Sequence, residues 1–297
     1  MPLRRTDKDV FQRYEQLKRT QHRWDFDDIL LAFCRATERT DGHIWRPFQA
    51  IRYLLVDEFQ DTNPVQWHIV HALHTRLGIP VYVTGDDDQS IYGFRGATPG
   101  WLLAFPDIFQ DVDRFYLSCN FRSDRSIVHA ASTLIAHNRL RVAKSFTVNS
   151  PLAGVCDVVD CRNEHEEATA VIAHIESVLA RQPEASIALL ARTRRQLQHT
   201  FAACPPALRK RIQFRTFHDA KGKEWDCVYI VGAVADCAAD VPQRPAVEEE
   251  RRTFYVAMTR ARQALHVHVP QRADGRRRDE SPFVAEAGLP TADARLD

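Results

Sequence analysis

The sequence predicts an α/β protein with parallel sheets, and two observations predict it. Four short runs are almost entirely apolar, which is typical of strands buried on both faces; they cover residues 53–56, 81–83, 187–190 and 228–231. Stretches with apolar residues at helical spacing lie among them, over residues 64–76, 124–138, 164–181 and 248–263. Because strand and helix alternate along the chain, we expect parallel sheets that are covered by helices.

The N-terminal segment, residues 6–36, is predicted to be helical. Its apolar side chains recur at helix spacing, in the order Phe11, Tyr14, Leu17, Phe26, Ile29, Leu30 and Phe33. Asp25 stands where a carboxylate can accept hydrogen bonds from the free amides of a first helical turn. We therefore expect Asp25 to cap the second of two helices.

The C-terminal part is expected to lose regular structure. His266 and His268 alternate on a segment that we interpret as an edge strand, and neither histidine is assigned a role. Residues from Arg272 onward include the run Arg276–Arg278 and few apolar side chains. Such a segment cannot bury much surface, so a mobile tail is expected over residues 271–297.

Composition excludes several classes of protein. The chain has 297 residues, of which 44% are hydrophobic and 27% are charged, so it is globular and long enough for two domains. No apolar stretch approaches the length of a membrane span, and the N-terminus lacks an apolar signal core. We therefore expect a cytoplasmic protein without a membrane partner. The net charge of +1 neither requires nor excludes a nucleic-acid partner, which must be argued locally.

The 7 cysteines are scattered along the chain and contain no CxxC pair. This pattern argues against a disulfide framework and against a zinc site, and it favours a reducing compartment. No cysteine is therefore assigned a role from the sequence.

Two of the predicted strands end in acidic side chains. Asp57 and Glu58 follow the first strand, and residues 86–88, all aspartate, come shortly after the second and precede Gln89. Ligands of open parallel sheets bind beyond the carboxyl ends of the strands. One carboxylate at that place can hold Mg²⁺, and another can polarise an attacking water. The alternative to such a site is that both strand ends are solvated loops, in which the acidic residues only favour turns.

Five segments, in order, resemble the motifs of one helicase family. LLVDEFQDTNPVQ (54–66) is similar to motif II, the DExx box, of the superfamily 1 helicases related to UvrD, Rep and PcrA. The later motifs are resembled by VTGDDDQSIYGFRGA (83–97, motif III), LSCNFRSDRSIV (117–128, motif IV), TFHDAKGKEWDCVYIVG (216–232, motif V) and EEERRTFYVAMTRAR (248–262, motif VI). The resemblance covers residues 10–270, and it implies ATP and Mg²⁺ as cofactors.

The resemblance also implies an architecture of two RecA-like lobes, which are parallel-sheet domains of the P-loop NTPase type. The first lobe is expected over residues 1–109 with motifs II and III, and the second over residues 110–270 with motifs IV to VI. Nucleotide hydrolysis in such a pair requires positioning and neutralisation of charge on the γ-phosphate. In the first lobe, the resemblance implies that Asp57 binds Mg²⁺, Glu58 activates the water and Gln89 senses the γ-phosphate.

In the second lobe, the resemblance implies that Arg122 and Arg260 reach the γ-phosphate, with Arg260 as an arginine finger. Phe121 is similar to the aromatic residue that stacks on the adenine in the family, and Glu224 to its contact with the ribose. The alternative for the two arginines is a surface salt bridge.

Single-stranded DNA, or a junction of single-stranded and double-stranded DNA, is the second ligand that the resemblance implies. Binding of a strand without sequence preference uses aromatic platforms and a basic track. Tyr92, Phe94 and Arg95 of motif III fit this description, and Thr216 and His218 of motif V resemble residues at the DNA backbone. The alternative for Tyr92 and Phe94 is ordinary core packing.

The chain departs from the family pattern in two ways. The phosphate-cradling loop G-x-x-x-x-G-K-[ST] does not occur in it, so the first lobe is expected to be incomplete and to expose a sheet edge and apolar surface. The family's helical insertion before motif V, the 2B subdomain, is also absent, because only residues 194–214 separate the preceding strand from motif V.

Three functions are consistent with these observations. The first is an ATP-dependent 3′–5′ DNA helicase or translocase in a truncated or split form, with a partner chain that supplies the phosphate loop. The second is a module that binds DNA or a partner without hydrolysing ATP. The third is a nuclease whose acidic clusters bind metals, which is disfavoured because the aspartates occur beside Gln89 and a stacking segment.

Overall fold

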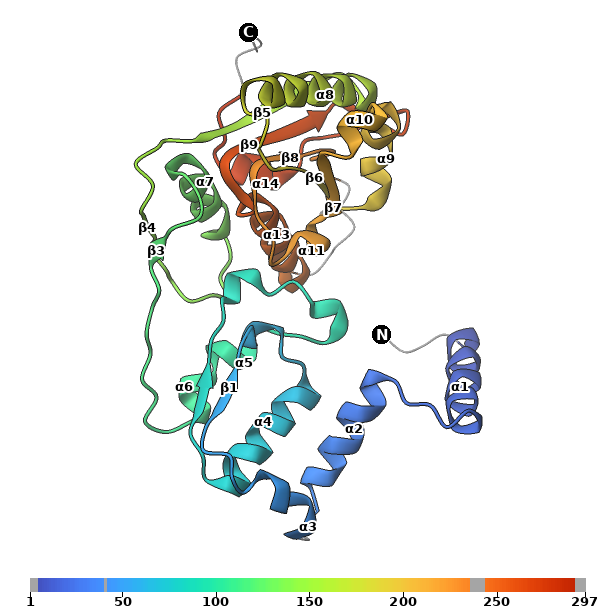
Figure 1. Ribbon diagram of the computed structural model, residues 1–297, viewed down its shortest axis with the longest axis vertical. Coiled ribbons are helices and arrows are strands. Elements are labelled where there is room, and N and C mark those ends of the chain that lie inside the picture. Colours follow the sequence, from blue (N-terminus) through green and yellow to red (C-terminus); the bar gives the residue numbers. More distant parts are fainter. Residues whose placement is uncertain (1–4, 40–41, 236–243, 292–297) are drawn as a thin grey trace.

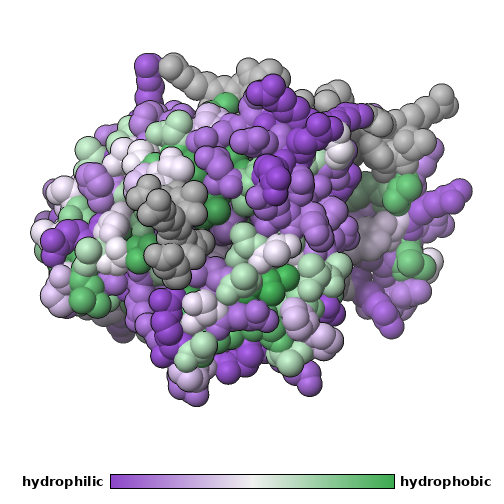
Figure 2. Space-filling view, turned by 90° about the horizontal axis from the view of Figure 1, so that it is seen from above, coloured by the Kyte–Doolittle hydropathy of each residue, from purple (hydrophilic) through white to green (hydrophobic). Residues whose placement is uncertain are grey.

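The computed structural model describes residues 5–39, 42–235 and 244–291, and Figure 1 shows their arrangement in two lobes. The first lobe holds the N-terminal part of the chain, up to α6 (Phe105–Ile108), and α1 lies to one side of it. The second lobe holds the larger C-terminal part, and extended chain joins the two. Figure 2 views the molecule from above and shows mostly hydrophilic side chains on that face, with scattered apolar ones.

The first lobe contains short strands and small helices. Its helices are α1 (Arg5–Thr20), α2 (Phe26–Thr37), α3 (Gly42–Trp45), α4 (Pro64–Leu77), α5 (Gly100–Leu103) and α6 (Phe105–Ile108). Its strands β1 (Leu54–Val56) and β2 (Val81–Val83) pair in parallel, with Leu54 opposite Val81. The predicted cap of α2 is confirmed, because Asp25 accepts from the Asp28 amide and Asp28 accepts from the Asp25 amide.

The incomplete sheet of the first lobe exposes apolar surface, as expected. Among the described residues, β1 and β2 form a sheet of two strands. Leu55 is 74% exposed and Tyr82 is 60% exposed, and both lie at the middle of their strands. The residues on either side of them, Leu54, Val56, Val81 and Val83, are half-buried, so the prediction of strands buried on both faces is wrong for this lobe. A strand needs cover on both faces to be buried, and the described chain supplies it on one.

The second lobe is built on a sheet of five parallel strands in the order β5-β9-β8-β6-β7. These strands are β5 (Val155–Cys161), β6 (Ile187–Ala191), β7 (Ile212–Thr216), β8 (Trp225–Ile230) and β9 (Ala261–Pro270). The helices are α7 (Arg125–Ile135), α8 (Glu164–Arg181), α9 (Arg194–Ala203), α10 (Pro206–Arg209), α11 (Phe217–Ala220), α13 (Arg244–Met258) and α14 (Pro282–Glu286). Two short parallel strands, β3 (Cys119–Asn120) and β4 (Thr147–Val148), pair with each other and precede β5 in the chain.

Helices cover both faces of this sheet and form two cores. Helices α8 and α9 pack on one face with Val171, Ile175 and Leu197. Helices α7, α13 and α14 pack on the other face and bury residues such as Leu134 and Phe254. Every residue of β6 is buried, so the prediction of fully buried parallel strands is confirmed here. No helix of the described chain is long and apolar enough to span a bilayer.

The C-terminal boundary of the last large helix differs from the prediction of 248–263. Helix α13 ends at Met258, and β9 begins at Ala261. Ala261 suits a helix face and a strand equally, so pairing decides its structure. The histidines of β9 also lie in the interior of the sheet rather than on an edge, because β9 pairs with both β5 and β8. His266 Nδ1 lies 2.8 Å from Asp157 Oδ1 on β5, which gives this buried ring a polar partner.

Residues 272–286 do not form the expected mobile tail. They contain the paired strands β10 (Arg272–Ala273) and β11 (Arg276–Arg277) and the helix α14. Phe283 and Val284 are buried in the core beside α7 and α13. Glu286 accepts from Arg251 of α13 at 2.6 and 2.7 Å. A few well-placed apolar residues thus fix a segment whose average composition is polar.

Candidate functional site

The loop after β1 presents Asp57 and Glu58 to solvent. Asp57 Oδ1 accepts from the Glu58 amide at 2.9 Å and from the Thr84 hydroxyl on the loop after β2. The Thr84 hydrogen bond, and then the Glu58 amide, lower the pKa of Asp57, so its carboxylate is ionised at neutral pH. Asp57 Oδ2 has no hydrogen-bond partner among the described residues. An ionised carboxylate with a free oxygen fits a Mg²⁺ ligand.

Glu58 is held in an unusual backbone conformation. Its φ of 52° lies in the left-handed region, which non-glycine residues seldom adopt and which is often found at functional sites. Gln60 is buried beside it, donates to the Glu58 carboxylate and accepts from the Asp86 amide at 3.1 Å. A Cβ on Gly85 would lie 2.6 Å from Gln60 Oε1, so a larger residue there would displace the Gln60 amide. Gln60 thus joins the acidic ends of both strands.

The three aspartates after β2 are neutralised by cations of the second lobe. Arg141 donates to both carboxylate oxygens of Asp88 at 2.9 and 2.7 Å. Lys144 Nζ contacts Asp86, Asp87 and Asp88, the last at 3.1 Å. Asp87 and Asp88 are buried. The interpretation of this strand end as solvated loop is therefore wrong, and these carboxylates are engaged in ion pairs between the lobes.

Gln89 connects the aspartates to Arg260. Gln89 Nε2 donates to Asp86 Oδ2 at 2.7 Å, and Arg260 Nη2 lies 3.5 Å from Gln89 Oε1. Arg260 is 1% exposed, and its hydrogen-bond partners are neutral oxygens of Val256, Lys223, Thr259 and Gln89. Burial, and then the charge of Arg122, lower the pKa of Arg260 to about 10. The guanidinium is still charged at neutral pH, and no carboxylate of the described chain pairs with it.

A buried cation without an anionic partner is costly to fold, because its solvation is lost and not replaced by an opposite charge. The arrangement at Arg260, with a second arginine close enough to lower its pKa, is typical of a site that binds an anion. A surface salt bridge, the alternative for this arginine, does not describe it.

Arg122 does form a salt bridge. Its Nε donates to Glu224, and Arg262 donates to the other oxygen of the same carboxylate, with its Nε at 3.2 Å. Arg262 and then Arg122 lower the pKa of Glu224 to about 2. Phe121, directly before Arg122, is 76% exposed. The three sequence-predicted residues Phe121, Arg122 and Glu224 thus lie together, with Arg122 held by Glu224.

The aromatic residues of motif III and the histidine of motif V form one cluster. The ring centroids of Phe94 and His218 are 5.5 Å apart, and those of Tyr92 and Phe94 are 6.0 Å apart. The Arg95 guanidinium lies 5.2 Å from the Tyr92 centroid and 5.4 Å from that of Phe94. Phe94 is 69% exposed, so it is not a core residue. Thr216 caps α11 by accepting from the Asp219 amide at 3.2 Å, which orients the turn that carries His218.

Sequence reasoning missed Lys221 of motif V. Its Nζ donates to Asp61 and, at 2.9 Å, to the carbonyl of Gln89, and it lies 3.7 Å from Glu58 Oε2. The side chain also lies over the Tyr92 ring, 5.1 Å from its centroid. A lysine between Ala220 and Gly222 carries no local signal, because its partners are in the other lobe.

Helix α13 makes further contacts between the lobes that the sequence did not indicate. Glu249 accepts from the Gly93 amide at 2.8 Å, and Arg252 Nε donates to the Ser90 carbonyl at 2.9 Å. Lys221 connects Glu58 to Gln89, and Gln89 in turn contacts Arg260. The acidic end of β1 and the buried arginine therefore belong to one network.

Two family models match this chain. The model described as UvrD/REP helicase N-terminal domain matches residues 1–110, and the UvrD-like helicase C-terminal domain matches residues 203–272. The chain belongs to the UvrD-like helicase family. This UvrD-like chain has the described α/β fold with parallel sheets, in agreement with the predicted fold class.

Relatives of this UvrD-like chain carry helicase names. ATP-dependent DNA helicase PcrA of Leuconostoc citreum is 34% identical over 57% of this chain and 23% of its own length. DNA helicase II of Rickettsia typhi is 32% identical over 65% of this chain and 29% of its own length. The chain thus spans less than a third of either relative. The solved C-terminal domain of a possible DNA helicase from a Lactobacillus aligns with 58% of this chain and 98% of its own, at 15% identity and a TM-score of 0.41, which is too low to carry an argument.

Proposed function

We propose that this chain carries the motif II to VI machinery of an ATP-dependent 3′–5′ DNA helicase or translocase, working in the cytoplasm. The observation that supports it most is the buried, unpaired Arg260 beside Gln89, in the same network as Glu58. The γ-phosphate of ATP is an anion of the required kind. It would neutralise Arg260 and connect the two lobes.

Each side chain of the first lobe has a role in this proposal. Asp57 would hold Mg²⁺, which neutralises phosphate charge when bound. Glu58 would accept a proton from the attacking water, and its left-handed backbone and the Gln60 contact orient its carboxylate. Gln89 would report the γ-phosphate to the DNA site, because its carbonyl is bound by Lys221 and Lys221 touches the Tyr92 ring.

The second lobe would supply the remaining contacts to ATP. Arg260 would act as the arginine finger, and Arg122 would turn from Glu224 toward the γ-phosphate when nucleotide enters. Glu224 would then be free to accept from the ribose hydroxyls, while Arg262 keeps it ionised. Phe121 offers an exposed ring on which the adenine could stack.

Single-stranded DNA, alone or at a junction with duplex, would bind at the cluster of Tyr92, Phe94, Arg95 and His218. The exposed Phe94 ring can stack on a base, and Arg95 can contact a phosphate from the same turn. Thr216 and His218 would contact the backbone of the strand. Hydrolysis would alter the contacts between the lobes and so move the strand over this cluster.

Hydrolysis also needs a phosphate-cradling loop, and the sequence contains none. We propose that a partner chain supplies the loop. This need favours a second candidate function, a module that binds DNA or a partner and does not hydrolyse ATP. The acidic residues 86–88 give no support to a nuclease, since Arg141 and Lys144 occupy them.

The test compares the chain alone with the chain plus a purified N-terminal fragment of a UvrD-like relative that carries the glycine-rich loop. We expect little ATP hydrolysis by the chain alone and DNA-stimulated hydrolysis with the fragment. Displacement from 3′-tailed but not 5′-tailed duplexes would establish the direction. DNA binding without hydrolysis in every mixture would favour the second candidate, and neither binding nor hydrolysis would overturn both.

Glu58→Gln provides the control for the chemistry. It keeps the size of the side chain but cannot accept a proton, so complemented hydrolysis should fall by about 100-fold or more while DNA binding is retained. Unchanged hydrolysis would refute the role of Glu58.

A further inference from the structure

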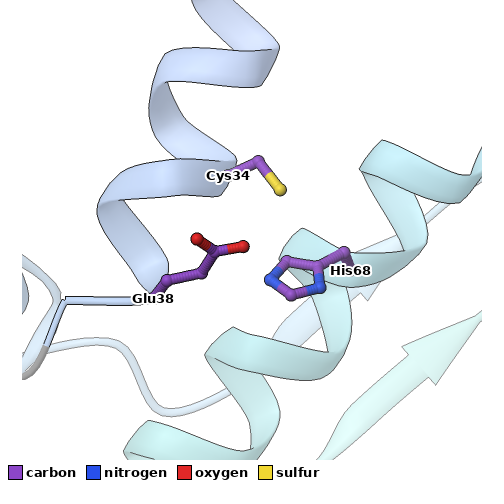
Figure 3. Close-up of side chains that lie close together, drawn as sticks. All are labelled: Cys34, Glu38 and His68. Carbon is purple, nitrogen blue, oxygen red and sulfur yellow. The ribbon is translucent and has the colours of Figure 1, made fainter.

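We propose that Cys34, Glu38 and His68 form a Zn²⁺ site between α2 and α4. Figure 3 shows the three side chains pointing toward one another, two from α2 and one from α4. One potential ligand atom of each residue lies within 4.8 Å of the others. This site lies outside the network that the proposed function uses and does not depend on it.

The two helices place these ligands by simple geometry. Cys34 and Glu38 are four residues apart, the second as the C-cap of α2, so they project from the same side of that helix end. His68 lies in the second turn of α4, which packs against α2. Capping boxes at Asp25 and Asn63 fix where each helix begins and therefore which residues face each other.

The donor set is typical of zinc. Thiolate, imidazole and carboxylate bind Zn²⁺ at about 2.0 to 2.3 Å, so ligand atoms around a tetrahedral ion lie about 3.3 to 3.8 Å apart. Side-chain rotations that move each ligand atom by about 1 Å would bring the three atoms to that spacing. A thiolate ligand disfavours Mg²⁺ and Ca²⁺, which take oxygen ligands. Three protein ligands leave the fourth position to water.

The three side chains are available to an ion. Within the part of the chain that the structure describes, neither Cys34 Sγ, the Glu38 carboxylate nor the His68 ring forms a hydrogen bond or ion pair. Cys34 is half-buried, and the other two are exposed, so an ion can enter from solvent. The sequence argued against zinc because it has no CxxC pair, whereas this donor set is assembled from two helices that are separate in the chain.

The consequence of zinc binding would be structural. The ion would tie α2 to α4, the helix that follows the loop carrying Asp57 and Glu58. Because binding favours the folded state, zinc should raise the thermal unfolding temperature in a concentration-dependent way.

The test uses the full chain, stripped of metal and kept reduced. Titration with Zn²⁺ alone should give one equivalent bound, and titration with Co²⁺ should give the charge-transfer absorption of a cobalt–thiolate bond. Cys34→Ser and His68→Ala should each weaken zinc binding by at least about tenfold. Cys119→Ser is the matched control, since Cys119 is exposed and lies outside the cluster, and it should bind as the unaltered chain does.

Three results would overturn the site. One is the absence of a cobalt–thiolate absorption in the unaltered chain, which requires no variant to fold. Another is equal zinc affinity of Cys34→Ser and Cys119→Ser. Binding that is lost with Cys34→Ser but retained with both His68→Ala and Glu38→Gln would reduce the site to a lone thiol and would also overturn it.

Discussion

Lys221 of the second lobe donates to the Asp61 carboxylate of the first lobe, and both side chains are largely buried. The two residues are 160 positions apart in the chain. Burial raises the pKa of Asp61, and Lys221 opposes that effect. The ion pair with Lys221 thus replaces part of the solvation that the Asp61 carboxylate loses. This contact lies between Glu58 and the Tyr92 ring, where ATP chemistry and DNA binding would have to communicate.

Lys221→Ala should destabilise the protein, because it leaves Asp61 buried without its cation. We expect a loss of about 2 to 3 kcal/mol in the free energy of unfolding, measured in urea. Adding Asp61→Asn should recover part of that loss, since a neutral amide tolerates the site better. Strictly additive effects of the two substitutions would mean that the residues do not interact.

Arg260→Ala should remove the proposed arginine finger. We expect complemented ATP hydrolysis to fall by about 10³-fold or more, because an arginine finger contributes that much to phosphoryl transfer. Arg162→Ala is the control, since Arg162 is exposed and pairs with Glu166 in the first turn of α8. Equal loss in both variants would contradict a specific role for Arg260.

The ion cluster of Asp86 and Lys144 predicts a pH dependence of stability. Burial opposes ionisation of Asp86, but Lys144 outweighs it, and the pKa of Asp86 falls below its ordinary value of 3.8. The contribution of Asp86 is therefore full above about pH 4 to 5 and is lost as pH falls through the lowered pKa. The aspartates raise the pKa of Lys144 against the effect of burial, so its contribution is full below about pH 10 and is lost at higher pH.

Lys144→Met tests this prediction. At pH 7 it should lower the free energy of unfolding by about 3 kcal/mol, because it leaves Asp86 and Asp87 without their cation, while Asp88 keeps Arg141. The difference from the unaltered protein should shrink as pH falls below 4 and Asp86 becomes protonated. Urea unfolding at several pH values between 3 and 7 measures the loss of stability at pH 7 and its decrease at lower pH. A difference that stays constant over this range would contradict the assigned ion pairs.

Phe94→Ala should weaken binding of single-stranded DNA. Loss of one stacking ring costs about 1 to 3 kcal/mol, which is about a 5- to 150-fold rise in Kd by fluorescence anisotropy. Phe115→Ala is the matched control, because Phe115 is also exposed but lies outside the cluster. Phe94→Trp should bind at least as tightly as the unaltered chain. If Phe94→Ala and Phe115→Ala have the same effect, the cluster is not the DNA site.

Most of the local structure could be predicted from sequence patterns alone. Periodicity located the helices α4, α7 and α8 and the strands β1, β2, β6 and β8, and the cap at Asp25 was predicted from one side chain. Motif order placed the chain in its family. These features depend on short-range patterns, which a single sequence displays directly. Glu58, Gln89 and Arg260, which the resemblance assigned to one site, lie in one network with Lys221.

Which charged groups and metal-ligand atoms meet depends on the three-dimensional fold. Ala261 could have continued α13, and pairing with Trp225 of β8 made it the first residue of β9. Lys221, Arg141 and Lys144 find their acids in the other lobe, and Cys34 and His68 meet across two helices. Each of these relations joins residues far apart in the chain. Their energies arise from burial and from partners brought by folding, so no local pattern in the sequence encodes them.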